Sequence, residues 1–210
     1  MRTPSEVHAA VAPLLETARE QGINSGEIDE HIDHALAFAG AWLSFCSESP
    51  TSAVDLGSGG GLPALPLIAA WPDCQWVLVE GRERRATFLG RAVRALGTED
   101  RVTIWNGDAQ ALSPDLYGTI DLVTARLFAA PAIVAECAGP LLAARGRIVV
   151  SEPEVDEALT RWPIGPLHDL GLAPTSCVVD GRPFSVLARH GDSPSAPPRR
   201  RARMERSPAF

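Results

Sequence analysis

The sequence contains no lysine, since all 19 of its basic residues are arginine. This absence excludes the GxxxxGK[ST] phosphate loop, Schiff-base enzymes and lysine general bases. Tyrosine is nearly absent as well, with Tyr117 alone. The four cysteines lie at least 28 residues apart, so no CxxC pair is available for a zinc or redox site. We therefore expect a chain kept in a reducing cytoplasm.

Long apolar runs are also missing. The longest weakly charged stretch, 127–144, contains Pro131, Glu136 and Pro140, which favour a buried helix over a membrane span. The start of the chain lacks the pattern of a signal peptide. We expect a soluble, unexported protein with no membrane partner. Its 210 residues, 45% of them hydrophobic, suffice for one sizeable core and therefore for one main domain.

Charge is distributed unevenly along the chain. The formal net charge is −7, yet residues 191–210 carry five arginines against Asp192 and Glu205. The remaining 190 residues therefore carry −10. Ser, Pro and Arg dominate the last 20 residues, which have almost nothing apolar to bury, and this composition predicts a disordered basic tail over 191–210.

Hydrophobic periodicity divides the rest of the chain into two parts. Residues 1–50 show the spacing of one helix face in two stretches, separated by Gly22 and Gly26, and predict a helical extension. Residues 51–190 alternate β-rich runs with helical stretches, such as the helix predicted over 82–96. The β-rich runs are 52–56, 76–80, 101–105, 120–125, 146–151, 176–180 and 184–189. This alternation predicts an α/β fold: a mostly parallel, seven-stranded, Rossmann-like sheet with helices on both faces, ending in an antiparallel hairpin.

The stretch VDLGSGGGLP, residues 54–63, occupies the turn from the first strand into the next helix. Ligands bind at this end of parallel sheets, and glycine lets the backbone approach them closely. The dinucleotide motif GxGxxG would require a glycine where Leu62 stands, which disfavours a nicotinamide-dependent oxidoreductase. The pattern DxGxGxG, through Asp55, Gly57, Gly59 and Gly61, instead resembles motif I of class I S-adenosylmethionine-dependent methyltransferases.

Two further strand ends agree with an adenosine ligand. Glu80 ends the second strand, 25 residues after Asp55, where a carboxylate can accept hydrogen bonds from both ribose hydroxyls. Asp108 follows the third strand and could accept from the adenine amino group. We expect the peptide groups of 57–61 and the Glu80 side chain to contact the cofactor.

A longer stretch, from Val54 to about Val150, resembles the RsmG family, also called GidB, whose members methylate guanine N7 in small-subunit ribosomal RNA. The resemblance rests on VDLGSGGGLPALPLIAA, VEGRERRATFLGRAV, DLVTARLFAAP and, more weakly, PLLAARGRIVV. It implies S-adenosylmethionine as cofactor, ribosomal RNA or the small subunit as partner, and a role in rRNA processing. By the same resemblance, cofactor contacts fall on Gly57, Leu62, Ala109, Gln110 and Arg126.

The chain departs from this family on the substrate side. Asp108 stands where members carry an arginine, 151–153 read Ser-Glu-Pro instead of a lysine and glycine, and the N-terminal KWN...NLT signature is missing. Guanine N7 presents a lone pair, so its methylation needs no general base, and no catalytic residue is assigned. A diverged paralogue acting on a small molecule or another RNA, and a non-catalytic cofactor-binding module, remain open.

His31 and His34 share a helix face, as metal ligands would. The other histidines are distant, so we predict no metal site and interpret this helix as one that caps the cofactor site or faces solvent.

Overall fold

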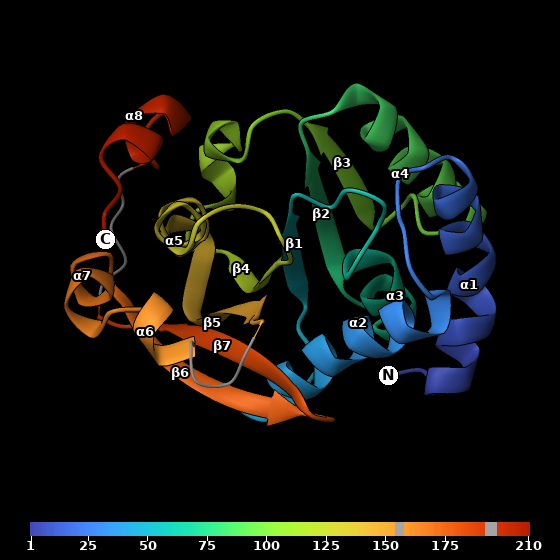
Figure 1. The fold of residues 1–210 in the computed structure, drawn as a ribbon, viewed down its shortest axis with the longest axis horizontal. Coiled ribbons are helices and arrows are strands. Elements are labelled where there is room, and N and C mark those ends of the chain that lie inside the picture. Colours follow the sequence, from blue (N-terminus) through green and yellow to red (C-terminus); the bar gives the residue numbers. More distant parts are fainter. Residues whose placement is uncertain (154–157, 192–196) are drawn as a thin grey trace.

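Seven strands form one sheet in the order β3-β2-β1-β4-β5-β7-β6 (Figure 1). The structure, a computed structural model, describes residues 1–153, 158–191 and 197–210. The strands are β1 (Ser52–Leu56), β2 (Gln75–Glu80), β3 (Val102–Asn106), β4 (Ile120–Ala125), β5 (Leu142–Ser151), β6 (Leu172–Val179) and β7 (Arg182–Arg189). The helices are α1 (Pro4–Glu20), α2 (Ile28–Leu43), α3 (Ala64–Ala70), α4 (Glu83–Ala95), α5 (Pro131–Ala138), α6 (Ala158–Arg161), α7 (Ile164–Asp169) and α8 (Arg201–Arg206). Short 3-10 helices cover Ala109–Ala111, Pro114–Leu116 and Gly139–Leu141.

The pairing of the strands confirms the predicted fold class. Strands β1 to β5 pair in parallel, and β7 pairs antiparallel to both β5 and β6. The order reverses between β1 and β4, which is the point where an open α/β sheet binds its ligands. Because β1, β2, β3 and β4 run in the same direction, their carboxyl ends meet at one edge of the molecule.

Alternation along the strands creates two cores. Ala53 faces a core shared with α1, α2, α3 and α4, whereas its neighbour Val54 faces a second core shared with α5 and α7. Successive strand side chains point to opposite faces, so a run of consecutive apolar residues is buried on both sides. This double burial explains the runs of consecutive apolar residues in the central strands, such as 76–79 in β2.

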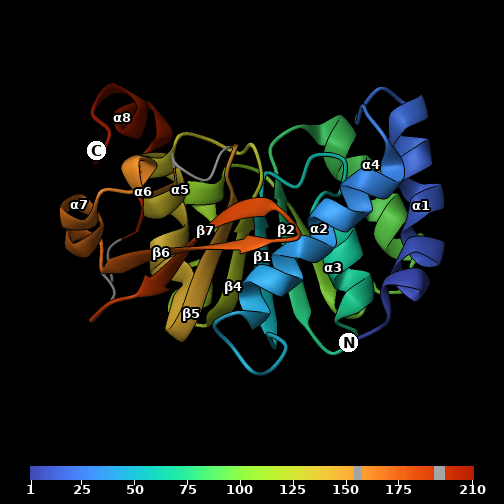
Figure 2. The same ribbon diagram turned by 60° about the horizontal axis from the view of Figure 1, so that its bottom comes forward.

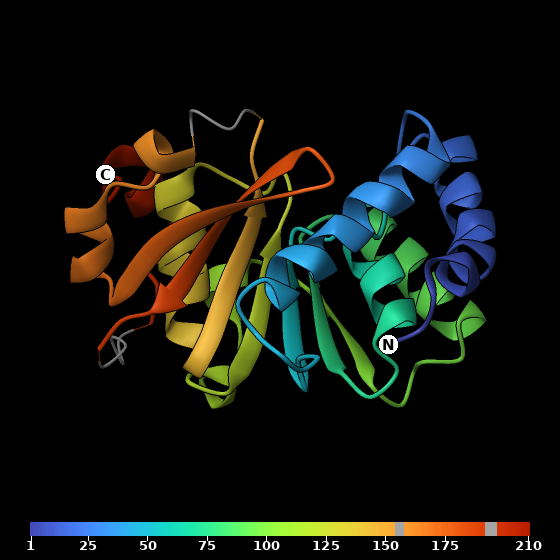
Figure 3. The ribbon, with the colours of Figure 1, turned by 90° about the horizontal axis from the view of Figure 1, so that it is seen from below.

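The N-terminal helices pack onto the sheet domain. A capping box between Thr3 and Glu6 begins α1, whose face of Val7, Val11 and Leu15 is fully or almost fully buried against α2 and α3. Helix α2 also crosses the hairpin of β6 and β7 (Figures 2 and 3). The linker between α1 and α2 thereby lies over the glycine turn after β1.

The apolar segment 127–144 forms α5 and the beginning of β5. Within the part of the chain that the structure describes, no helix has both the length and the apolar character that crossing a bilayer requires.

The end of the chain differs from its sequence-based prediction. Residues 201–206 form α8, and Met204 within it is completely buried. Composition predicts disorder because arginine, serine and proline dominate this segment. In the structure, Met204, Phe210 and the ion pair between Arg199 and Glu136 nevertheless dock residues 197–210 on the body. The structure thus differs from the expected disorder over these residues, whereas residues 192–196 lie outside the described ones.

Candidate functional site

The glycine turn after β1 is held by its own N–H groups. Those of Gly57 and Ser58 donate to the carbonyl of Val79 at 2.9 Å, and that of Gly61 donates to the carbonyl of Ser58 at 2.7 Å. The Gly59 N–H donates to Glu80 Oε2 at 2.9 Å. We expected peptide groups here to be free for a ligand. Most of the N–H groups are engaged within the protein, so the turn offers a ligand close approach to a backbone that carries few side chains.

Three glycines of this turn have a positive φ, namely Gly57, Gly59 and Gly61. A Cβ atom at Gly57 would lie 2.7 Å from Cδ2 of Phe128, and one at Gly60 would lie 2.0 Å from Oδ1 of Asn24. Contacts this short do not occur for real Cβ atoms, so a side chain at Gly57 would displace Phe128 and one at Gly60 would displace the end of Asn24. At Gly57 the backbone conformation favours glycine as well.

Glu80 joins the turn to the end of β2. It is 6% exposed, and its Oε1 accepts from the Arg82 N–H at 2.8 Å while Oε2 accepts from Gly59. Each carboxylate oxygen has a second lone pair that these bonds do not use. The side chain is therefore fixed in position and still able to accept hydrogen bonds from a ligand.

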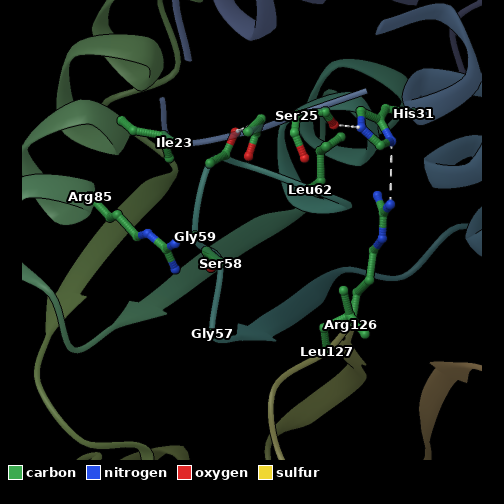
Figure 4. Close-up of a pocket in the computed structure, with 12 residues that line it drawn as sticks. Ile23, Ser25, His31, Gly57, Ser58, Gly59, Leu62, Arg85, Arg126 and Leu127 are labelled. Atoms are coloured by element: carbon green, nitrogen blue, oxygen red, sulfur yellow. Dashed lines mark hydrogen bonds between the residues drawn. The ribbon is translucent and has the colours of Figure 1, made fainter. Parts of the chain in front are cut away.

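A first pocket, here called the glycine-loop pocket, has a volume of about 260 Å³. It lies between the glycine turn, the α1–α2 linker and the end of β4 (Figure 4). Its lining comprises Ile23, Asn24, Ser25, His31, Gly57, Ser58, Gly59, Gly60, Leu62, Arg85, Arg126 and Leu127.

A second pocket, the Glu80 pocket, has a volume of about 290 Å³ and adjoins the first at Gly57, Arg85 and Leu127. Its lining comprises Gly57, Val79, Glu80, Gly81, Arg82, Arg85, Gly107, Asp108, Ala109, Leu127, Phe128 and Arg201. The two pockets form one groove across the carboxyl ends of β1 to β4. This is where the sequence places the cofactor.

Arg126 and His31 close one side of the glycine-loop pocket. Arg126 Nη2 donates to His31 Nδ1 at 3.3 Å, and His31 Nε2 bonds the carbonyl oxygen of Ser25, as Figure 4 shows. This pair of contacts requires the tautomer with the proton on Nε2. Arg126 Nη1 is buried and has no hydrogen-bond partner among the described residues. Burial lowers the pKa of Arg126, yet the nearby Asp55 partly offsets this effect. An unsatisfied guanidinium nitrogen beside the glycine turn suits the carboxylate of an amino-acid moiety.

Asp55 lies beneath the turn and lines neither pocket. Its Oδ1 accepts from Thr124 Oγ1 at 2.6 Å, whereas its Oδ2 is buried without a partner in the described part of the chain. Burial raises the pKa of Asp55 to about 6, against the lowering effect of its hydrogen bonds. The motif aspartate thus supports the turn from below.

A third pocket, the His34 pocket, adjoins the groove at Arg126 and Leu127 and has a volume of about 480 Å³. Its lining comprises His34, Ala125, Arg126, Leu127, Phe128, Ala129, Val134, Val150, Ser151, Glu152, Pro153 and Arg161. Glu152 is engaged, since its carboxylate accepts from Trp162 Nε1 at 2.6 Å and from Arg161. This pocket is a candidate site for a second ligand beside the groove.

His34 gives a pH-dependent contribution to stability. Burial, and then the charges of Arg126, Arg182 and His31, lower the pKa of His34 to about 4. An unfolded chain binds this proton near pH 6.5, so between about pH 6.5 and 4 the unfolded state holds more protons and the free energy of unfolding falls as the pH falls. We predict that His34→Gln makes Tm decline less than in the unsubstituted protein between about pH 7 and pH 4.5. Equal slopes in thermal unfolding by circular dichroism would contradict the prediction.

The structure brings most of the sequence-predicted site residues together. Gly57, Gly59, Leu62 and Arg126 line the glycine-loop pocket, and Glu80, Asp108 and Ala109 line the Glu80 pocket. Gly61 and Gln110 line neither: Gly61 packs on Leu65, and Gln110 lies in the 3-10 helix after β3.

Sequence reasoning missed Asn24, Ser25, Arg85, Phe128 and Arg201. Asn24 and Ser25 follow Gly22 in a segment with no motif, although Asn24 Nδ2 donates to the carbonyl of Gly60 at 3.1 Å. Arg85 belongs to the stretch VEGRERRATFLGRAV that carries the family resemblance, but no cofactor contact is predicted for it. Among the described residues, no group of three or more His, Cys, Asp or Glu side chains is placed to hold a metal ion. His31 instead lines the groove, as one of the interpretations of its helix predicts.

The sheet order, the glycine turn after β1 and the carboxylate at the end of β2 define a class I methyltransferase fold. An O-methyltransferase from Streptomyces achromogenes, solved in complex with S-adenosylmethionine, has the same fold with a TM-score of 0.59 over 87% of this chain and 90% of its own, at 19% identity.

The chain belongs to the GidB family, described as rRNA small subunit methyltransferase G, whose model matches residues 22–158. A relative of that name from a Roseiflexus species is 30% identical over 83% of this chain and 79% of its own. Another, from Kineococcus radiotolerans, is 39% identical over 52% of this chain, but this match spans only 42% of the relative. The predicted resemblance is confirmed, and S-adenosylmethionine is the cofactor that fold and family indicate.

Proposed function

We propose that this protein transfers a methyl group from S-adenosylmethionine to RNA, with guanine N7 of small-subunit ribosomal RNA as the acceptor. The observation that carries the proposal is the continuous groove over the ends of β1 to β4, which adjoins the His34 pocket at Arg126. Its residues fit the cofactor: Arg126 has an unsatisfied donor for the carboxylate, and Glu80 has free lone pairs for the ribose hydroxyls.

S-adenosylmethionine would supply an electrophilic methyl group in this groove. Arg126 and the glycine turn would hold the amino-acid end, while Glu80 and Asp108 would hold the adenosine. The residues of the chain thus bind and orient the two reactants. Correct orientation of two reactants lowers the activation free energy by roughly 7–11 kcal/mol.

The His34 pocket favours an acceptor that needs no strong base. His34, with a pKa of about 4, is a weak base, and Glu152 is already bonded to Trp162 and Arg161. All four cysteines lie in the described residues, and none lines the three pockets. Guanine N7 fits this chemistry because it attacks through a lone pair without prior deprotonation.

Charge shows where RNA would have to bind. A body of net charge −10 repels RNA as a whole, so binding depends on local arginines. On α4, Arg94 pairs with Glu99 and Arg84 bonds the carbonyl of Gln21, whereas Arg82 and Arg85 line the groove. We expect RNA phosphates to contact the arginines at the mouth of the groove.

We predict that the protein incorporates labelled methyl groups into small ribosomal subunits from a strain that lacks its own enzyme of this family, and none into large subunits. Strand cleavage specific for N7-methylguanine should locate the label.

In a second experiment, S-adenosylhomocysteine at about 100 times its Kd should raise the free energy of unfolding by about 2.7 kcal/mol, whereas NADH should not. Stabilisation without incorporation would contradict the rRNA proposal and favour another acceptor or a non-catalytic module.

A further inference from the structure

The C-terminal segment, residues 197–210, docks beside the Glu80 pocket. Its helix α8 contacts α5. Figures 1 and 2 show α8 at the same end of the molecule as α5, α6 and α7. Met204 is completely buried in the same core as α5, and the Phe210 ring lies 6.4 Å from the Trp162 ring, centroid to centroid. Two apolar side chains therefore anchor a segment whose other residues are mostly polar.

An ion pair fixes the beginning of this segment. Arg199 Nε donates to Glu136 Oε2 at 2.6 Å, and Arg199 Nη2 donates to Glu136 Oε1. Glu136 is 6% exposed on a helix that is otherwise apolar, PAIVAECA. A buried carboxylate without a partner is strongly destabilising. The bidentate bond to Arg199 explains why α5 carries an acidic residue on its buried surface.

Arg201 extends the segment into the cofactor groove. Its guanidinium carbon lies 5.9 Å from the centroid of the Phe128 ring, within the range of a cation–π interaction. Its Nε donates to Glu205 Oε1 at 2.8 Å, which orients the side chain. Phe128 in turn packs against Gly57. Arg201 and Asp108 therefore line the same pocket from different elements.

We propose that the docked segment 197–210 completes the ligand-binding site through one residue, Arg201, which closes the Glu80 pocket over the adenosine part of the ligand. This inference rests on the proposed function, because it takes the ligand to be S-adenosylmethionine or S-adenosylhomocysteine. Docking of the segment and binding of the ligand then stabilise each other, since coupling between two such events is reciprocal.

Isothermal titration of the full chain with S-adenosylhomocysteine tests the proposal. Arg201→Ala removes a side chain that lines the Glu80 pocket, and Arg199→Ala removes the ion pair with Glu136 that docks the segment. Each substitution should weaken binding of S-adenosylhomocysteine about tenfold. Arg206→Ala is the matched control: it removes the same charge from an exposed position of the same helix and should change Kd less than about twofold. Circular dichroism would verify that each variant is folded.

Limited digestion with trypsin gives a second measurement, because α8 contains several arginines. S-adenosylhomocysteine should slow cleavage within 197–210 in the unsubstituted chain, and less so in Arg199→Ala. Unchanged affinity in Arg201→Ala, with no protection from trypsin, would overturn this inference alone. The same holds if Arg201→Ala weakens only RNA binding. If the unsubstituted chain binds no S-adenosylhomocysteine, the proposed function falls and this inference with it.

Discussion

Glu80→Gln should weaken S-adenosylhomocysteine binding by about 100-fold, equivalent to about 2.7 kcal/mol. The carboxylate accepts from two backbone N–H groups, those of Gly59 and Arg82, and it lines the pocket with lone pairs that these two bonds do not use. A glutamine has only one acceptor oxygen, so its NH₂ group would oppose one of these N–H donors and displace the glycine turn. Isothermal titration measures the loss directly.

The control for this variant is Glu83→Gln, which removes the same charge from an exposed position in the first turn of α4. Its affinity should stay within about twofold of the unsubstituted protein. If Glu80→Gln bound the ligand as tightly as Glu83→Gln, the carboxylate would have no part in ligand binding, and the Glu80 pocket would not be the adenosine site.

Gly57→Ala should destabilise the fold by about 2–4 kcal/mol, since it combines a left-handed backbone with overpacking. The backbone of Gly57 has φ +73°, and the added Cβ would lie 2.7 Å from the Phe128 ring. For a chain of this length the loss corresponds to a fall in Tm of roughly 5–15 °C. Ligand affinity should fall as well, because Gly57 lines both pockets of the groove.

Gly90→Ala is the matched substitution within a helix. Gly90 lies in α4, and a Cβ there would meet nothing within 4 Å, so alanine should raise stability by up to about 1 kcal/mol. Thermal unfolding of both variants separates a requirement for glycine at the turn from a general sensitivity to mutation. Equal Tm values for the two variants would show that the turn tolerates a side chain.

Local patterns predict the sheet and the strand-end half of the site. Alternating β-rich and helical runs indicate the fold, and the ends of consecutive parallel strands must meet, so Glu80, Asp108 and Arg126 could be placed near the glycine turn from their positions alone. The boundaries shifted most at the starts of β5 and β6, which begin at Leu142 and Leu172 instead of 146 and 176. In each strand the first leucine is followed by small residues, proline or polar residues, which carry little β signal.

The other half of the site depends on contacts between distant segments, which periodicity does not encode. Asn24 reaches Gly60 across 36 residues, and Arg199 reaches Glu136 across 63. The C-terminal segment, residues 197–210, shows more clearly that sequence patterns do not encode contacts between distant segments. Composition measures how much apolar surface a segment can bury on average, whereas docking here depends on Met204 and one buried carboxylate on another helix. The domain bounds at residues 50 and 190 stay predictions.

The packing of α1 affects how the protein unfolds. Val7, Val11 and Leu15 belong to the same continuous core as α3 and the near faces of β1 and β2. Since that core also supports the glycine turn from behind, loosening the first helix exposes the surface on which the turn rests. The helical extension and the sheet should therefore unfold in one cooperative transition. The groove should be lost whenever the first 20 residues detach from the sheet domain.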